Sequence, residues 1–225
     1  MDDKTLVTGS VDGVISFWKV VSGERPSLEL SESLVGHGDL ITSLTVSKAW
    51  SLLVSGSRVR PALLSHSSVS IVAQVTDLRL SHLVSRLQNG NVLLWDLNRV
   101  KYVRTIYSDP DTPVHLLKVN ENNGHIALCH SSTIELYTLN GAFICSTLTA
   151  HPTDPILSVA WFDTREWSAV QMIATGHSRG KIVLWSLNAD GTPVGEKAIW
   201  KLSALRTIHY RGGDTADVTS LRFWG

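Results

Sequence analysis

A glycine followed five residues later by a tryptophan recurs in this chain, and this repeat restricts the fold more than any other feature. Three copies lie in the runs Thr8–Trp18, Asn89–Trp95 and Thr175–Trp185. In each copy a short turn leads into a strand of Val, Ile or Leu and an aromatic residue, which is the pattern of a β-hairpin. A more divergent copy, Leu128–Tyr137, has tyrosine in the place of tryptophan. The chain is therefore expected to be a repeat of β-hairpins.

Further β-rich segments flank these hairpins and extend them to four strands. Two lie upstream, at Leu40–Val46 and Ile156–Trp161, and two lie downstream, at Tyr102–Ile106 and Leu205–Ile208. Four strands per repeat, the absence of a convincing helix pattern and the Trp95-Asp96 pair resemble the blades of WD-repeat proteins. The resemblance implies an all-β fold, namely part of a WD40-type β-propeller with about four to five four-stranded blades and an incomplete ring.

WD blades join a loop histidine, a strand serine or threonine, a turn aspartate and the tryptophan indole, because a buried indole and a buried imidazole both need hydrogen-bond partners. The resemblance implies this structural role for Thr8, Asp12 and Trp18 in the first blade, for His37, Ser55, Trp95 and Asp96 in the second, and for His151, Thr175 and Trp185 in the fourth. None of these sets is complete. Asn89 and Arg179 stand where the turn aspartate is expected, and the first blade has no upstream histidine.

Residues 59–88 interrupt the second repeat, so the propeller blades are expected at 1–58 and 89–225. Hairpin glycines stand four residues apart at Gly9 and Gly13 in the first repeat, as they do in the fourth. Removal of the 30 residues 59–88 gives the second repeat the same spacing. The segment therefore falls in the tightest turn of the blade, where a loop of this length is unusual.

Two interpretations of the inserted segment remain open. The first is an irregular surface insertion, in which Val75–Leu87 would form a short amphipathic helix. The second is a translated intron, because the codons of Val59-Arg60 can spell a splice donor, Thr76-Asp77 can contain a branch site and Gln88 can end in an acceptor. The length of the segment also keeps the reading frame.

Several segments are more specific than a generic WD repeat. Ile41–Trp50, Leu53–Arg58, Asn91–Ile106 and Leu139–Ile144 resemble the C-terminal WD repeats of the BEACH family, the beige and neurobeachin relatives. The intron-like insert would fit a fungal member. The resemblance implies a non-catalytic scaffold for protein binding in vesicle trafficking, lysosome-related organelles or autophagy. It also implies a cytoplasmic location with peripheral attachment to endosomal or vesicle membranes.

The resemblance also bears on partners. Proteins or peptides would bind through the propeller faces, and the missing blades or the BEACH domain of a longer chain would complete the assembly. We expect the chain to be a fragment for this reason, and we expect its unpaired sheet edges to make it prone to aggregation. The alternative is a WD-repeat adaptor of another complex, such as a ubiquitin ligase.

Catalytic and metal-binding motifs find little support. The sequence contains no P-loop, dinucleotide fingerprint, nucleophile elbow or His-Glu-x-x-His motif. His125, Cys129 and His130 suggest a metal site, but neighbouring residues on a strand point to opposite faces. No catalytic, cofactor-binding or metal-binding residue is therefore predicted. Equal numbers of basic and acidic residues, 20 each, argue against nucleic-acid binding.

Two groups of residues are candidate partner contacts. Lys201 and Arg206 lie in a basic stretch with interleaved aromatic residues, which would suit a lipid or protein contact or would simply be a solvated outer strand. Trp161 and Trp167 flank a polar loop, and they would form a contact at the rim or pack between blades.

Overall fold

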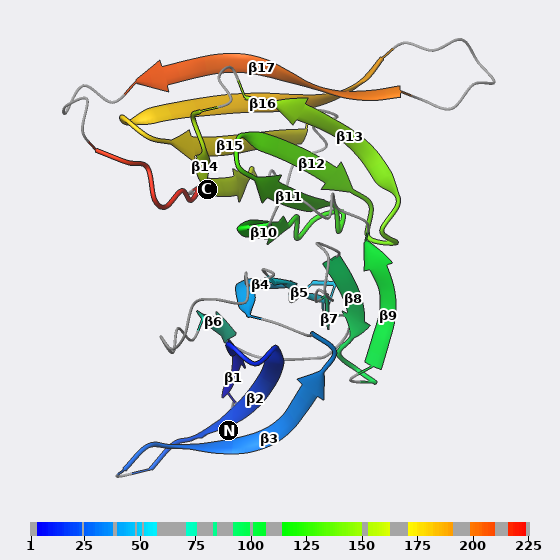
Figure 1. Cartoon of the computed structure of the whole chain (residues 1–225), viewed down its shortest axis with the longest axis vertical. Coiled ribbons are helices and arrows are strands. Elements are labelled where there is room, and N and C mark those ends of the chain that lie inside the picture. Colours follow the sequence, from blue (N-terminus) through cyan, green and yellow to red (C-terminus); the bar gives the residue numbers. More distant parts are fainter. Residues whose placement is uncertain are drawn as a thin grey trace, which may run out of the picture. The chain divides into compact units, whose positions relative to one another are not determined.

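The computed structural model describes fourteen stretches of the chain, and it shows two compact units, Met1–Glu121 and Asn122–Gly225. The described residues are 4–23, 25–37, 40–47, 49–50, 52–57, 71–75, 83–84, 92–99, 101–106, 114–149, 153–162, 171–190, 199–209 and 216–223. Their regular structure is entirely β (Figure 1). In these stretches no helix has the length and apolar character to cross a membrane.

The first sheet combines three consecutive strands with one from the inserted segment. β1 (Lys4–Gly9), β2 (Val14–Val21) and β3 (Ser27–Val35) form an antiparallel meander, and β6 (Ile71–Val75) pairs with the free edge of β1. The sheet order is β3-β2-β1-β6. Alternation of apolar and polar residues along β2 buries Ile15 and Phe17 in the core. We call this sheet blade 1.

The second sheet, blade 2, contains five strands. They are β4 (Ile41–Ser47), β5 (Leu52–Ser57), β7 (Leu83–Val84), β8 (Val92–Asp96) and β9 (Lys101–Ile106), in the order β4-β5-β7-β8-β9. β7 lies between β5 and β8, which are the hairpin strands in the other blades. All six residues of β5 are buried, as expected for a strand near the middle of a sheet.

The remaining two sheets have four strands each, in sequence order. Blade 3 consists of β10 (Leu116–Val119), β11 (Ile126–His130), β12 (Thr133–Tyr137) and β13 (Phe143–Leu148). Blade 4 consists of β14 (Ile156–Trp161), β15 (Gln171–His177), β16 (Lys181–Asp190) and β17 (Ile199–His209). Figure 1 shows β14 to β17 lying side by side.

Glycines with positive φ end the hairpin turns of blades 1 and 4. Arg179 and Gly180, between β15 and β16, have φ of 55° and 65°, as the two central positions of a type I′ turn require. Gly13, between β1 and β2, has φ of 81°. Both turn glycines therefore stand where residues with a Cβ would be strained.

The structure confirms the prediction of an all-β chain of WD-type blades, and it corrects one expectation about the inserted segment. Within the range of the expected helix, Val75–Leu87, the structure describes only Val75 and Leu83–Val84, and these residues lie in the strands β6 and β7 rather than in a helix. The backbone groups of these residues pair with β1, β5 and β8 instead. The boundaries of the insertion at 59 and 88 lie outside the described residues and stay a prediction.

Candidate functional site

Within blade 1, and likewise within blade 4, the tryptophan lies in contact with the threonine of the same blade. The Trp18 indole donates a hydrogen bond to Thr8 Oγ1 at 2.8 Å, and the Trp185 indole donates one to Thr175 Oγ1 at 2.9 Å. The strand register explains both bonds, because each threonine lies diagonally across the hairpin from its tryptophan. Asp12 does not join this pair in blade 1. Its carboxylate accepts hydrogen bonds within the turn, from the Ser10 hydroxyl and the Val14 amide.

Blade 2 joins the predicted histidine and serine but leaves the tryptophan apart. His37 Nε2 lies 3.3 Å from Ser55 Oγ, and both side chains are buried. The Trp95 indole nitrogen is buried and has no hydrogen-bond partner among the described residues. The register of β5 and β8 would place Leu53 opposite Trp95, but Leu83 of β7 takes that place. The intrusion of β7 thus accounts for the missing bond.

Asp96, the acidic residue of the Trp-Asp pair, lies at the end of β8. Its carboxylate accepts a hydrogen bond from the Arg99 amide at 3.1 Å and lies 3.9 Å from the Arg99 guanidinium. Asp96 therefore stabilises the turn before β9, which is a local role.

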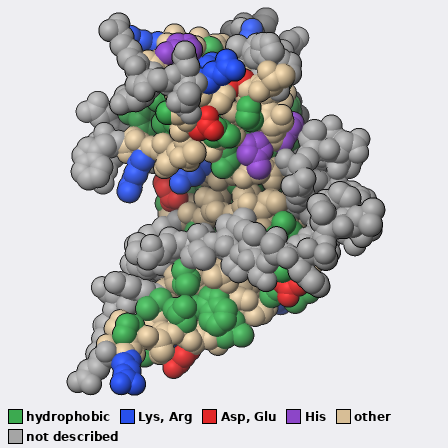
Figure 2. Space-filling model, turned by 60° about the vertical axis from the view of Figure 1, so that its left-hand side comes forward, with side chains coloured by type: hydrophobic (Ala, Val, Ile, Leu, Met, Phe, Trp, Pro, Cys, Tyr) green, Lys and Arg blue, Asp and Glu red, His purple; other side chains and the backbone are tan. Residues whose placement is uncertain are grey.

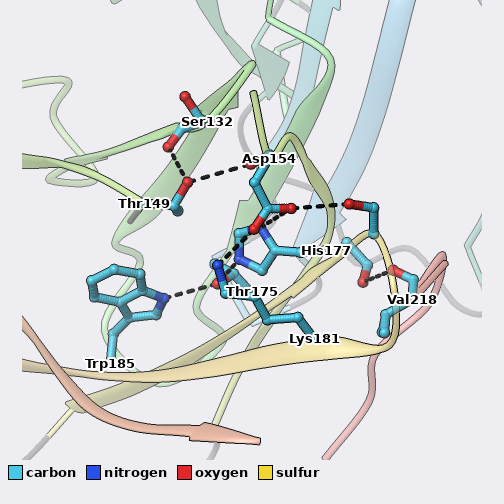
Figure 3. A network of polar contacts seen from close by, with 10 residues as sticks. Ser132, Thr149, Asp154, Thr175, His177, Lys181, Trp185 and Val218 are labelled. Carbon is cyan, nitrogen blue, oxygen red and sulfur yellow. Dashed lines mark hydrogen bonds and ion pairs between the residues drawn. The ribbon is translucent and has the colours of Figure 1, made fainter. Parts of the chain in front are cut away.

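Blade 4 contains the most extended polar network. His151 lies outside the described residues, and the imidazole beside Thr175 belongs to His177, with Nε2 at 2.9 Å from Thr175 Oγ1 (Figure 3). His177 Nδ1 lies 3.7 Å from Asp154, which also forms an ion pair of 2.6 Å with Lys181. The Ser178 hydroxyl donates a hydrogen bond of 3.1 Å to the same carboxylate.

Electrostatics favour a charged Asp154 and a neutral His177. Burial alone would raise the pKa of Asp154, but Lys181, His177 and Ser178 together outweigh it and hold the pKa below its ordinary value. Burial lowers the pKa of His177, although the Asp154 charge opposes this effect. The network therefore holds one ion pair, Asp154 with Lys181, next to a neutral imidazole.

The order Asp154, His177, Thr175 resembles that of a hydrolytic triad, but its position does not suit catalysis. The side chains of Thr175 and His177 have no exposed surface, and the Thr175 hydroxyl already accepts a hydrogen bond from the Trp185 indole. A nucleophile must reach its substrate, so the arrangement suits a structural role. His177 was missed in the sequence, although its two-residue spacing from Thr175 places both on one face of β15.

Blade 3 contains a related network that the sequence did not reveal. His130 ends β11 as His177 ends β15, and its Nε2 lies 3.2 Å from Glu135. The Tyr137 hydroxyl donates a hydrogen bond of 2.7 Å to the same carboxylate. Glu135 therefore links imidazole and aromatic side chain, the role that Thr175 has in blade 4.

The candidate metal ligands are not gathered into a site. Among the described residues no group of three or more His, Cys, Asp or Glu side chains could hold a metal ion. Burial raises the pKa of the Cys129 thiol above its ordinary value and that of Cys145 to about 11, so neither is a ready thiolate. His130 contacts Glu135, as described above.

The candidate partner contacts differ in their accessibility. Trp161 is only 4% exposed and pairs with Ile173, so packing rather than a rim contact describes it. Trp167 lies outside the described residues. Lys201 and Arg206 both lie on the outer strand β17, five residues apart, and both side chains are exposed. They are therefore accessible to a partner surface.

No protein-family model matches this chain. Protein SPIRRIG of Arabidopsis thaliana is 25% identical over 86% of the chain. Beige protein homolog 1 of Schizosaccharomyces pombe is 25% identical over 94% of it, and the human lysosomal-trafficking regulator is 30% identical over 82%.

The chain spans about 5% of the length of the first of these relatives, and 4% to 8% of the other two. A further relative is named BEACH domain-containing protein A2, from Arabidopsis thaliana, at 26% identity over 86% of the chain. The chain is therefore a WD-repeat homologue of the BEACH-family proteins, and the resemblance inferred from its motifs is confirmed.

Proposed function

We propose that the chain is a non-catalytic scaffold that binds proteins in membrane trafficking, as a WD-repeat portion of a BEACH-type protein. The similarity to BEACH-family proteins over 82–94% of the chain carries this proposal. One of these relatives is named for lysosomal trafficking. The expected location is the cytoplasm, with peripheral attachment to endosomal or vesicle membranes. A WD-repeat adaptor of another complex, such as a ubiquitin ligase, is the alternative.

The distribution of side chains supports a binding role. The polar groups of the blade networks contact one another in buried positions, while the outer strands expose apolar side chains. Figure 2 shows apolar side chains gathered over blade 1, where Leu28 and Leu30 of β3 are 51% and 56% exposed. Exposed apolar side chains on a rigid sheet are suitable contacts for a protein partner.

The outer strand of blade 4 supports a second contact, with an anionic membrane surface. On β17 the apolar side chains Trp200, Leu205 and Ile208 are 38%, 55% and 39% exposed, and the basic Lys201 and Arg206 are exposed beside them. Basic groups attract anionic lipid headgroups and tryptophan favours the interface, so β17 combines both contributions.

Direct binding to a BEACH domain tests the proposed function. The full chain is titrated with the BEACH domain of Beige protein homolog 1 in an isothermal titration calorimeter. We expect saturable binding with a dissociation constant on the order of 10 μM or tighter. Absence of binding contradicts the proposed partner. Recovery of ubiquitin-ligase subunits with the chain from its own cells, without any BEACH-domain protein, would favour the adaptor alternative.

A further inference from the structure

The same hydrogen bond fixes the start of three segments. The amide of Ile41, the first residue of β4, donates to the Ser10 carbonyl at 3.1 Å, and the amide of Ile156, the first residue of β14, donates to Ser131 at 2.9 Å. The Val218 amide donates to the His177 carbonyl at 2.9 Å. β4 and β14 are the first strands of their blades, which we call inner strands. Val218 therefore begins a segment placed like an inner strand.

Close packing around a hairpin glycine marks the same position. A Cβ added to Gly9 would lie 2.6 Å from Ile41 Cγ2, and one added to Gly176 would lie 2.6 Å from Val218 Cγ1. The first residue of the following inner strand thus covers the glycine in both cases. In addition, the Ser158 hydroxyl donates to the Val218 carbonyl at 2.7 Å, as the Thr42 hydroxyl donates to Val114 at 2.8 Å.

The sequence of the segment 216–223 agrees with this placement. Ile41-Thr42-Ser43 and Ile156-Leu157-Ser158 begin the two inner strands, and Val218-Thr219-Ser220 repeats their pattern. In both blades the serine faces the hairpin glycine, since Ser43 pairs with Gly56 and Ser158 with Gly176. Residues 216–223 belong to no strand ladder with the described residues. Their contacts within the copy include the backbone hydrogen bonds of Ala216 and Val218 at the β15–β16 turn and the edge-to-face contact of Phe223 with Phe162.

Blade 1 offers the complementary edge. In blade 1, β6 lies beside β1, where the other blades have their inner strand, and Ile71 is paired with Gly9. Serine takes that place in blades 2 and 4. A segment with the pattern of 216–223 would place Ser220 opposite Gly9 and so reproduce the pairing of the other blades.

We propose that the β1 edge is a strand-exchange site, which β6 occupies in this structure and which accepts residues 216–223 of a second copy of the chain. Strand addition to an edge gains a ladder of main-chain hydrogen bonds, and the glycine-serine match sets the register. Reciprocal exchange would supply blade 1 of each copy with an inner strand of the common pattern. The result is a dimer that does not depend on the proposed trafficking partner.

Engineered disulfides test the exchange in the full chain. With Ser220 opposite Gly9, the antiparallel register places Phe223 opposite Leu6. The double variant Leu6→Cys with Phe223→Cys should form a covalent dimer on oxidation with copper-phenanthroline, visible by non-reducing electrophoresis. Leu6→Cys with Arg222→Cys is the matched control, because a shift of one residue turns the second thiol to the other face. Leu6→Cys alone reports any background from Cys129 and Cys145.

Displacement of β6 should favour the exchange. Ala73→Pro removes an amide from β6, and it should raise the dimer yield of the Leu6→Cys with Phe223→Cys variant at least about twofold. A crosslinked monomer overturns the proposal, and so does the absence of a specific crosslink both with and without Ala73→Pro. In case the variants fold poorly, light scattering of the unmodified chain should show a mass that rises with concentration from 24.7 kDa toward twice that value. A mass that stays at one chain overturns the proposal.

Discussion

At the scale of single residues, Thr175 is the residue that connects the polar network of blade 4. Its hydroxyl accepts a hydrogen bond from the Trp185 indole and contacts His177, and its side chain is fully buried. A buried polar group that loses its partner costs about 1–3 kcal/mol. The network is therefore expected to contribute more to stability through this hydroxyl than through the partly exposed ion pair of Lys181 with Asp154.

Substitution of Thr175 tests this contribution. Thr175→Val keeps the shape of the side chain but leaves the Trp185 indole without an acceptor, and it should lower the free energy of unfolding by about 1–3 kcal/mol. Thr175→Ser keeps the hydroxyl and should cost less. Urea denaturation measures both variants. Equal losses for valine and serine would show that the hydroxyl does not matter.

His177 should make stability depend on pH. Burial lowers the pKa of His177 in the folded chain, whereas the unfolded side chain titrates near its ordinary pKa of 6.5. As pH falls below 7 the unfolded chain binds the proton first, so stability is lost over the interval between the two pKa values. The slope reaches at most about 1.4 kcal/mol per pH unit for one group. Urea titrations between pH 7 and pH 5 should show a smaller slope in His177→Gln, and an unchanged slope would contradict this assignment.

Residue patterns revealed only part of these networks. The pairs Thr8 with Trp18 and Thr175 with Trp185 follow from the hairpin frame, because the turn glycine fixes the register across two adjacent strands. Asp154 could not be found in this way, because it lies just before β14 and not in the hairpin turn where the WD pattern has its aspartate. Glu135 could not be found either, because it takes the place that serine or threonine has in that pattern. The histidine beside Thr175 is His177 of strand β15, whereas the common WD pattern has this histidine in a loop.

At the scale of elements, the joint between blades depends on glycine. A Cβ at Gly176 would lie 2.6 Å from Val218 Cγ1 and in contact with Ser158, so no side chain fits between β15 and the segment at 216–223. Gly23 offers a contrast, because a Cβ there would meet nothing within 4 Å.

The two glycines form a matched pair of variants. Gly176→Ala should lower the free energy of unfolding by about 1–3 kcal/mol, because overpacking forces neighbouring atoms to shift. Gly23→Ala should stay within about 0.5 kcal/mol of the unmodified chain. Chemical denaturation of both variants distinguishes the joint from a general effect of alanine. Losses of the same size would mean that the joint is not tightly packed.

β17 is the element on which the membrane contact depends. The double variant Lys201→Glu with Arg206→Glu should weaken pelleting of the chain with anionic liposomes, because each basic residue near the surface contributes about 1 kcal/mol of attraction. Lys101→Glu with Arg104→Glu makes the same change of charge on β9, the outer strand of blade 2, where both residues are also exposed. Pelleting that falls equally in both variants would indicate a response to net charge rather than a contact through β17.

At the scale of the whole molecule, the strand order of the blades could be predicted because hairpin connections are short and local. The strands β6 and β7 could not be predicted, since they pair with distant segments. The fourth strand of blade 4 was expected at Leu205–Ile208, and β17 extends it back to Ile199. β7 leaves β5 and β8 only two direct pairs, Leu52 with Asp96 and Ser55 with Leu93, whereas β15 and β16 form six. This interruption supports the proposal that residues 59–88 are foreign to the blade, and a transcript joining the Arg58 and Asn89 codons would support an intron.

Amide hydrogen exchange of the chain with and without residues 59–88 tests most directly whether the rest of the chain is a row of WD-type blades. Deletion joins Arg58 to Asn89 and restores an Asn-Gly turn between β5 and β8, which favours a two-residue hairpin. Mass spectrometry should then show amides of β4, β5 and β8 at least as strongly protected as in the unmodified chain, with protection of β14 to β16 unchanged. Loss of protection throughout β4, β5 and β8 on deletion would contradict the account, because residues 59–88 would then be an essential part of blade 2.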